Sequence, residues 1–259
     1  MTLAIAIAGA GGHMGRALIA AAQQNPAFRI VGATKRPGSG ALTGEQSIAP
    51  VEDVRAAAAS TDVWIDFTTP AATLAALDAL AATPARAVVI GTTGFTPDDE
   101  AKIAAAAQRI AIVRAGNFSL GVNLIVALAE QAARRLGPDW DAEILEAHHR
   151  RKVDSPSGTA LMLGEAVAKG RGKKLAELRA DPHQGDVAPR EHGKIGFASV
   201  RGGGIVGEHE VIFAGEREVV MLSHQALDRA VFADGALTAA LWVADKPPGL
   251  YAMRDVLGF

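Results

Sequence analysis

LAIAIAGAGGHMG, residues 3–15, is the stretch that decides the fold. Its first half alternates leucine or isoleucine with alanine, as expected of a short central strand that is covered on both faces. A glycine cluster follows, then a helical stretch over 16–25 that ends before Pro26, and a second strand over 29–33. A strand, a glycine turn, a helix and a second strand in this order predict a dinucleotide-binding unit.

The glycines of this turn have different physical tasks. Gly9 permits a tight turn, Gly11 or Gly12 lets the backbone approach a pyrophosphate, and Gly15 lets the helix pack closely on the strand. The start of the helix then offers N–H groups and the positive end of its dipole to the phosphates. The spacing is Gly9-x-x-Gly12-x-x-Gly15 rather than G-x-G-x-x-G, so a purely structural turn is the alternative interpretation.

The end of the second predicted strand bears on the choice of cofactor. The sequence there is Thr34-Lys35-Arg36, without a carboxylate that could accept the ribose hydroxyls. Two adjacent cations favour a 2′-phosphate, so we expect Lys35 and Arg36 to contact the cofactor and NADPH to bind at least as well as NADH. A solvated basic loop is the alternative.

The alternation of strands and helices continues through the first half of the chain. Strands are predicted over 63–67, 87–90 and 110–115, and helices from Pro70 onward and over 97–108. Each strand ends in small or hydroxyl-bearing residues, in the loops TTP (68–70), GTTG (91–94) and GNFS (116–119). Because ligands of open parallel sheets bind beside the carboxyl ends of the strands, these loops predict a ligand site, although any one of them could be an ordinary turn.

The second half of the chain has a different pattern. A long amphipathic helix is predicted over 121–136, stopped by Gly137-Pro138. Runs with strand character follow over 142–148, 195–201, 206–213 and 218–223, separated by glycine turns. We predict a second domain of α+β type with a mostly antiparallel or mixed sheet.

The densest chemical segment is EAHHRRKVDSPSGTA, residues 146–160. Two histidines, two arginines and a lysine lie within residues 148–152, and the turn Ser-Pro-Ser-Gly-Thr then caps a helix that runs to about Lys169. Cations beside a helix N-terminus suit a substrate with two carboxylates, and a histidine can supply a proton at neutral pH. A charged surface loop is the alternative.

Composition excludes several other classes of function. The chain of 259 residues has a formal net charge of −2, which does not indicate a nucleic-acid or membrane-surface binder. It has no cysteine, which excludes disulfides and cysteine-ligated metal and fits a reducing compartment, so we expect a cytoplasmic protein. Adjacent histidines on a strand point to opposite faces, so we expect no metal site.

Six segments in order along nearly the whole chain resemble the 4-hydroxy-tetrahydrodipicolinate (dihydrodipicolinate) reductase family of the diaminopimelate route to lysine. They are the glycine turn, DFTTP (66–70), GTTG, GNFSLGVN (116–123), EAHHRRKVDSPSGTA and GLYAMRDVLG (249–258). The HHRRKVDSPSGTA segment is the most specific of them. The resemblance implies a Rossmann-type dinucleotide-binding domain with an inserted α+β substrate and oligomerisation domain.

The resemblance also implies roles for single residues. His148 matches the proton donor or acceptor, and Lys152 matches a second catalytic group that also holds the substrate. The residues that match substrate contacts are His149, Lys152, Gly158 and Thr159. Those that match or look like cofactor contacts are Gly9, Ala10, Gly11, Gly12, His13, Met14, Arg36, Gly91, Thr92, Thr93, Ala115, Gly116, Asn117, Phe118, Arg229 and Phe232.

The family further implies a domain division and an assembly. Residues 1–119 and 229–259 would form the dinucleotide-binding domain, and 120–228 the inserted substrate-binding and tetramerisation domain, in a homotetramer whose inserted sheets pack between subunits. The chain departs from some members at Lys35, where they carry an acidic residue, so a preference for NADH is not implied. A reductase for another substrate and a non-catalytic NADPH-binding sensor are the rival functions.

Overall fold

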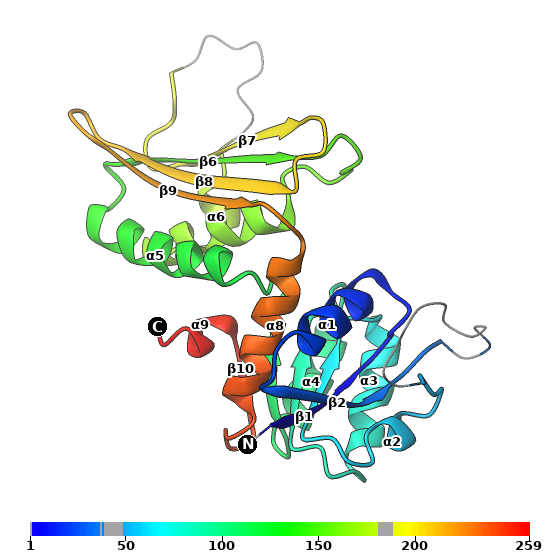
Figure 1. The fold of residues 1–259 in the computed structure, drawn as a ribbon. Coiled ribbons are helices and arrows are strands. Elements are labelled where there is room, and N and C mark those ends of the chain that lie inside the picture. Colours follow the sequence, from blue (N-terminus) through cyan, green and yellow to red (C-terminus); the bar gives the residue numbers. More distant parts are fainter. Residues whose placement is uncertain (1, 37, 39–48, 181–188) are drawn as a thin grey trace. The chain divides into compact units, whose positions relative to one another are not determined.

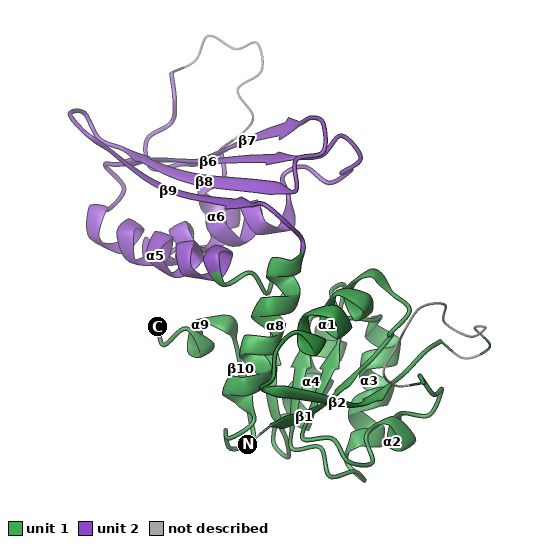
Figure 2. Cartoon of the chain, in the orientation of Figure 1, with its two compact units in different colours: residues 1–120, 230–259 green, residues 121–229 purple. Residues whose placement is uncertain are grey.

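The computed structural model describes residues 2–36, 38, 49–180 and 189–259. By its internal contacts the chain divides into two compact units, shown in Figure 2. Unit 1 comprises Met1–Leu120 and Ala230–Phe259, and unit 2 comprises Gly121–Arg229. Unit 2 is therefore an insertion in the sequence of unit 1, with both boundaries one residue later than we expected.

Unit 1 is built on a parallel six-stranded sheet in the order β10-β5-β4-β3-β1-β2. The chain starts in the interior at β1, adds β2 on one side and then crosses to β3 on the other, so the strand order reverses beside β1. Ligands of such sheets bind at this reversal. The strands are β1 (Leu3–Ile7), β2 (Phe28–Ala33), β3 (Val63–Asp66), β4 (Ala87–Ile90), β5 (Ala111–Arg114) and β10 (Gly249–Tyr251).

Helices cover both faces of this sheet, as Figure 1 shows. One apolar cluster joins alternate strand residues such as Ile5 and Ile7 to α1 (His13–Gln23) and α8 (Ala230–Val243). The other joins residues such as Trp64 to α3 and α4. Burial on both faces explains why these strands read as continuous apolar runs. The remaining helices of the unit are α2 (Val54–Ala57), α3 (Pro70–Leu80), α4 (Pro97–Ala106) and α9 (Met253–Val256).

Unit 2 is built on a mixed four-stranded sheet in the order β7-β6-β8-β9. The β6–β7 pair is parallel, and the β6–β8 and β8–β9 pairs are antiparallel. The predicted mixed sheet is therefore confirmed. The elements are α5 (Leu120–Leu136), which begins at the last residue of unit 1, β6 (Asp141–His148), α6 (Gly158–Gly170), α7 (Leu175–Leu178), β7 (Ile195–Arg201), β8 (Gly207–Ala214) and β9 (Val219–Ala226).

The two long helices of unit 2 lie on one side of its sheet (Figure 1). Apolar residues of α5 and α6 pack against alternate residues of the strands, such as Ile144 on β6 and Phe213 on β8. Every second residue of β6 and β8 is buried, which is the period of a sheet with one covered face. No described helix of the unit covers the opposite face.

None of the helices in the described part of the chain combines the length and the apolar character needed to cross a bilayer.

Candidate functional site

The glycine turn in unit 1 has the geometry that its sequence predicts. Gly9 lies in the left-handed region with φ +66°, where a glycine is favoured. A Cβ on Gly15 would overlap the carbonyl oxygen of Gly9, so only glycine allows α1 to pack this closely on the turn. The helix begins at His13 rather than at Arg16, because the chain already turns into it after the extended Gly12.

The start of α1 is suited to bind an anion. Gly12 is its N-cap, and no side chain caps the helix there. The first-turn N–H groups of His13, Met14 and Gly15 have no partner within the helix. Together with the helix dipole, these groups fit the pyrophosphate of a dinucleotide.

The end of β2 is fixed against the same turn. The amide of Gly9 donates to the side chain of Thr34 at 3.2 Å, and the amide of Ala10 donates to the carbonyl oxygen of Thr34 at 2.8 Å. The next two residues are the half-buried Lys35 and the exposed Arg36. The two predicted cations therefore follow directly on the residue that holds the glycine turn.

A buried carboxylate fixes the neighbouring loops. Asp66, at the end of β3, is 1% exposed and accepts hydrogen bonds from the hydroxyls of Thr68, Thr73 and Thr92 at 2.6, 3.1 and 3.3 Å. It also accepts one from the indole of Trp64 at 3.3 Å. Since Thr92 belongs to the GTTG loop, Asp66 holds two of the predicted cofactor loops in one place.

Packing joins the third loop to these two. The rings of Phe67 and Phe118 lie 5.2 Å apart, and a Cβ on Gly91 would overlap the ring of Phe67. Phe118, Thr92 and Ala10 are almost fully buried, so they support the walls of these loops from within.

Most of the predicted cofactor residues lie in unit 1. The sets around Gly9, Gly91 and Gly116 occupy loops at the carboxyl ends of β1, β4 and β5. Phe232 lies on α8 of the same unit, whereas Arg229 is the last residue of unit 2.

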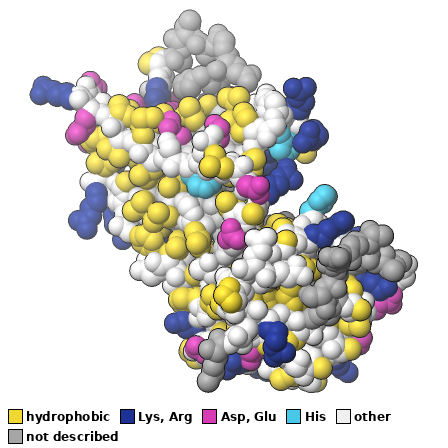
Figure 3. Space-filling model, in the orientation of Figure 1, with side chains coloured by type: hydrophobic (Ala, Val, Ile, Leu, Met, Phe, Trp, Pro, Cys, Tyr) yellow, Lys and Arg dark blue, Asp and Glu magenta, His cyan; other side chains and the backbone are white. Residues whose placement is uncertain are grey.

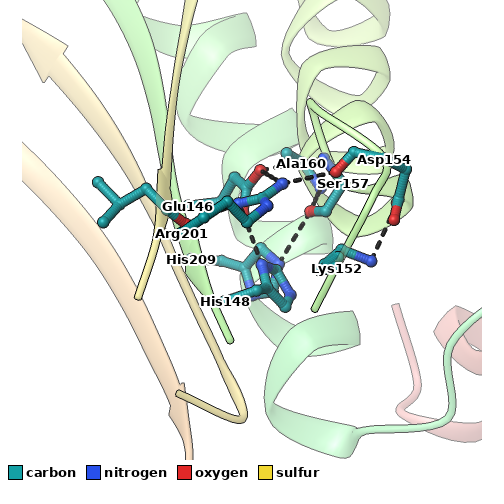
Figure 4. A network of polar contacts seen from close by, with 9 residues as sticks. Glu146, His148, Lys152, Asp154, Ser157, Ala160, Arg201 and His209 are labelled. Atoms are coloured by element: carbon teal, nitrogen blue, oxygen red, sulfur yellow. Dashed lines mark hydrogen bonds and ion pairs between the residues drawn. The ribbon is translucent and has the colours of Figure 1, made fainter. Parts of the chain in front are cut away.

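Unit 2 holds a second polar cluster around His148, shown in Figure 4. The ring nitrogen Nδ1 of His148 lies 2.5 Å from Oε2 of Glu146, two residues earlier on the same face of β6. Arg201, at the end of β7, contacts both carboxylate oxygens of Glu146 at 2.8 and 2.7 Å. The carboxylate of this bidentate pair is shielded from water, since the side chain of Glu146 is 1% exposed, whereas that of Arg201 is 20% exposed.

A second histidine, His209, packs against the ring of His148. The rings of His209 on β8 and His148 are 5.0 Å apart in an edge-to-face arrangement, and Nε2 of His209 lies 3.3 Å from the hydroxyl of Ser157. Burial, followed by the charge of His148, lowers the pKa of His209 to about 4. His209 is therefore neutral at physiological pH.

The predicted anion-binding turn is attached to this cluster. Ser157 is the N-cap of α6, and its hydroxyl accepts from the amide of Ala160 at 3.2 Å, which confirms the predicted cap. The amide of Ser157 donates to Oε1 of Glu146 at 3.2 Å. Gly158 and Thr159 form the first turn of α6. The predicted substrate-binding turn and His148 are thus connected through one carboxylate.

Lys152 lies on the loop between β6 and α6. Its ammonium is 2.9 Å from the carboxylate of Asp154, and its side chain is 23% exposed. The same contact lowers the pKa of Asp154. His149 is half-buried, and its Nδ1 is buried without a hydrogen-bond partner among the described residues.

Burial of the ring is the main reason why His148 favours its neutral form. Burial lowers the pKa of His148 below its usual 6.5, and Lys152 and Arg201 lower it further, whereas Glu146 raises it. Burial would raise the pKa of Glu146, but the bonds from Arg201, Ser199 and His148 outweigh this and lower it to about 2. The cluster therefore contains an ionised carboxylate beside a mostly neutral imidazole at neutral pH.

Sequence reasoning missed three members of this cluster. Glu146 could have been found, because it lies two residues before His148 and the period of a strand puts both on one face. Arg201 is opposite His148 only through the parallel register of β6 and β7, which no local pattern reveals. His209 occupies a core position of β8, where a histidine resembles an apolar residue in pattern.

A metal centre has no basis in the described ranges. Nowhere among these residues do three or more potential ligand side chains gather as a metal ion requires.

Comparison with known proteins identifies the family. The model "Dihydrodipicolinate reductase, N-terminus" matches residues 3–118, and "Dihydrodipicolinate reductase, C-terminus" matches residues 121–257. The chain belongs to the dihydrodipicolinate reductase family. The resemblance seen in the sequence is thus confirmed, and with it the oxidoreductase class of this family.

Curated relatives and a solved structure of this family align with nearly the whole chain. The 4-hydroxy-tetrahydrodipicolinate reductases of Caulobacter vibrioides and Dinoroseobacter shibae are each 52% identical to it, and the alignments cover 98% of this chain and 97% of theirs. The dipicolinate-bound dihydrodipicolinate reductase from Paenisporosarcina sp. TG-14 has a TM-score of 0.81 at 25% identity, covering 97% of this chain and 98% of that one. The fold prediction of a Rossmann-type unit with an inserted mixed-sheet unit is confirmed.

Proposed function

We propose that this chain catalyses the reduction of 4-hydroxy-tetrahydrodipicolinate to tetrahydrodipicolinate in lysine biosynthesis. The substrate loses water and gains a hydride from NADPH or NADH and a proton, so the products are tetrahydrodipicolinate, the oxidised nucleotide and water. The observation that carries the proposal is the buried Glu146–His148 pair, connected to the cap of α6 and followed by Lys152. It combines a titratable proton donor with groups that bind carboxylates.

The residues of unit 1 would hold the nucleotide. The first turn of α1 would bind the pyrophosphate, the loops fixed by Asp66 would bind the nicotinamide half, and Lys35 and Arg36 would bind the adenosine end. When bound, the reduced nicotinamide supplies the hydride that adds to C4 of the substrate ring.

The residues of unit 2 would hold the dicarboxylate and supply the proton. Lys152 and the first turn of α6 would bind carboxylates, which draws negative charge from the conjugated imine and makes it a better hydride acceptor. His148 would donate a proton to the carbon beside C4. Its pKa in the free protein is lowered partly by Lys152, so a bound carboxylate that neutralises Lys152 would raise the proton affinity of His148.

The direct test is nucleotide oxidation with the freshly made condensation product of pyruvate and aspartate semialdehyde. We expect the absorbance of NADPH or NADH to fall only when this product is present. If neither nucleotide is oxidised although both bind, the chain acts on another substrate or is a sensor. Oxidation with unrelated imines but not with this product would favour the rival reductase.

The compartment also belongs to the proposal. A reductive biosynthetic step and a chain without cysteine fit the reducing cytoplasm, which we propose as its location.

The basic pair after β2 predicts the nucleotide preference. We expect Arg36→Ala to raise the KM for NADPH by about ten- to a hundred-fold, since a hydrogen bond to a charged group contributes about 1.5–3 kcal/mol, while the KM for NADH changes little. Lys35→Ala should act in the same direction. Arg29→Ala, which removes an exposed cation from β2 itself, is the matched control. Equal losses with both nucleotides would show that these cations do not bind a 2′-phosphate.

The open face of the unit 2 sheet supports a homotetramer. Val200 on β7, Leu145 on β6, and Val219 and Met221 on β9 point to this face and are 58%, 39%, 55% and 56% exposed. Figure 3 shows hydrophobic side chains across the visible part of unit 2. Glu208 and Glu210 of β8 share this face, and exposed apolar residues gathered on a sheet face with a polar rim are typical of an interface. We therefore propose that these faces pack against copies of themselves in a homotetramer.

A single charge on this face tests the assembly. We expect Met221→Arg to convert a tetramer into smaller species in sedimentation equilibrium, because an unpaired charge would be buried at the interface. Leu124→Arg is the control, since Leu124 on α5 is 41% exposed but lies on the helical side of the sheet. A monomeric wild-type protein, or a tetrameric Met221→Arg variant, would contradict the proposal.

A further inference from the structure

One buried carboxylate organises the second cluster. Oε2 of Glu146 contacts Nδ1 of His148 at 2.5 Å, and Oε1 accepts from the amide of Ser157 at 3.2 Å. The guanidinium of Arg201 donates to both oxygens at 2.8 and 2.7 Å. The same guanidinium donates to the carbonyl oxygen of Asp154 at 2.6 Å. Figure 4 shows these groups converging on Glu146 from β6, β7 and the loop before α6.

We propose that Glu146, clamped by Arg201, is a positioning residue that keeps the proton of neutral His148 on Nδ1 and leaves Nε2 to exchange a proton with the substrate. This inference deepens the proposed function and rests on it. Arg201 has no acceptor group and a carboxylate paired with it is ionised, so the short contact to Glu146 requires His148 to be the donor. The hydrogen bond at Nδ1 then selects the tautomer and the orientation of the ring.

The ion pair of Glu146 with Arg201 also keeps the exchanged proton on His148 and not on the carboxylate. The bonds to Glu146 hold its pKa near 2, far below that of an imidazole. The carboxylate therefore stabilises a protonated His148 without taking the proton itself, which is the role of the aspartate in a serine-protease triad. A solvent-exposed carboxylate without Arg201 would have a higher pKa and would hold the ring less firmly.

Charged or titratable groups face His148 from every element around it. Glu146 lies on its own strand, Arg201 is its neighbour on β7, His209 faces it from β8, and Lys152 approaches on the following loop. On β8 a glycine also leaves room for the ring, since a Cβ on Gly207 would lie 3.2 Å from Nε2. Of these groups, Glu146 alone favours the protonated ring.

The same carboxylate sets the position of the anion-binding turn. By accepting from the amide of Ser157, Glu146 holds the residue that caps α6 and precedes Gly158 and Thr159. Arg201 adds a second connection to this segment at Asp154. The pair thus fixes the proton donor and the proposed carboxylate-binding turn relative to each other within unit 2.

Nuclear magnetic resonance on the free protein tests the tautomer without any turnover. With ¹⁵N-labelled histidine, and His148→Gln to assign the signals, couplings from the ring protons distinguish the protonated from the bare nitrogen. We expect the proton on Nδ1 of His148 in the wild type above its pKa. A proton on Nε2 would overturn the proposal, whether or not the protein reduces the proposed substrate.

Two variants should move the pKa of His148 in opposite directions. Glu146→Gln removes the group that raises it and should lower it, whereas Arg201→Gln removes a cation that lowers it and should raise it. A residue that only supports the fold would not produce this sign reversal. Glu130→Gln is the matched control, because Glu130 on α5 is a buried carboxylate bonded to Arg134 and Lys169 at 2.9 Å each.

Kinetics complete the test. We expect Glu146→Gln to lower kcat by about 10²–10³-fold with little change in KM, because orientation of the donor is lost while the carboxylate binders remain. Glu130→Gln should keep the wild-type kcat and the wild-type pKa of His148. An unchanged pKa of His148 in Glu146→Gln would overturn the proposal, and if that variant does not fold, an unchanged pKa in Arg201→Gln would do so.

Discussion

Replacing His148 by glutamine should lower kcat by about 10²–10⁴-fold, the range of a general acid, while the KM for the dicarboxylate changes little. Glutamine has a similar length and can still contact Glu146, but it cannot donate a proton to carbon. Steady-state oxidation of NADPH measures both constants. His192→Gln is the control, since His192 is an exposed histidine of unit 2 that lies 3.1 Å from the carboxylate of Asp139.

The pH dependence of the wild type should carry the signature of the same group. The pKa of His148 lies below 6.5 in the free protein, so the donor form is lost as the pH rises through that value. We therefore expect kcat/KM to fall from a plateau at lower pH along a limb with its midpoint below 6.5. The limb should be absent in His148→Gln. Full turnover in that variant would show that His148 is not the donor.

The fold could be predicted largely because its signals are local. The strands β1 to β5 of unit 1 are short apolar runs that end in a glycine or hydroxyl turn, and Thr69 and Thr96 precede prolines at helix starts as capping residues do. The edge strand β10 was missed because it has only three residues, which are too few to show the alternation of apolar and polar residues that indicates a strand. Helix α8 was not predicted either, since alanine and larger apolar residues lie on all its sides and leave little amphipathic contrast.

The candidate site could be predicted only in part. His148, Lys152 and the cap of α6 lie within one segment, so their chemistry is visible in the sequence. The contact of Arg201 with Glu146 spans 55 residues and depends on strand register, and the position of His209 depends on the β6–β8 pairing. Long-range pairing is decided by tertiary packing, which no local pattern encodes.

Replacing Lys152 by methionine should lower kcat/KM by about 10²–10³-fold, through a higher KM and a lower kcat together. The ammonium would bind a substrate carboxylate in the ground state and draw charge from the ring as hydride adds, so its loss affects both steps. Truncating one partner of a buried, hydrogen-bonded charge pair costs about 2–5 kcal/mol, or about 30- to 5,000-fold, and the expected loss lies in the middle of this range. The stem of methionine keeps most of the apolar contacts of the lysine.

The control for Lys152 is a lysine in a similar pair on the neighbouring helix. Lys169 on α6 lies 2.9 Å from Glu130, as Lys152 lies 2.9 Å from Asp154, so Lys169→Met removes an equal charge from unit 2. It should leave kcat and KM near their wild-type values. Equal losses in both variants would mean that Lys152 acts through the net charge of unit 2 and not through a contact with the substrate.

A variant of Asp154 tests how this carboxylate affects the binding of the substrate by Lys152. Its carboxylate competes with a substrate carboxylate for the ammonium of Lys152, so Asp154→Asn should lower the KM for the dicarboxylate by several-fold. Arg201 still finds the main-chain carbonyl at this position, because that contact does not involve the side chain. A higher KM in Asp154→Asn would contradict this expectation. It would mean that the ion pair with Asp154 holds the ammonium of Lys152 in the position in which it binds the substrate.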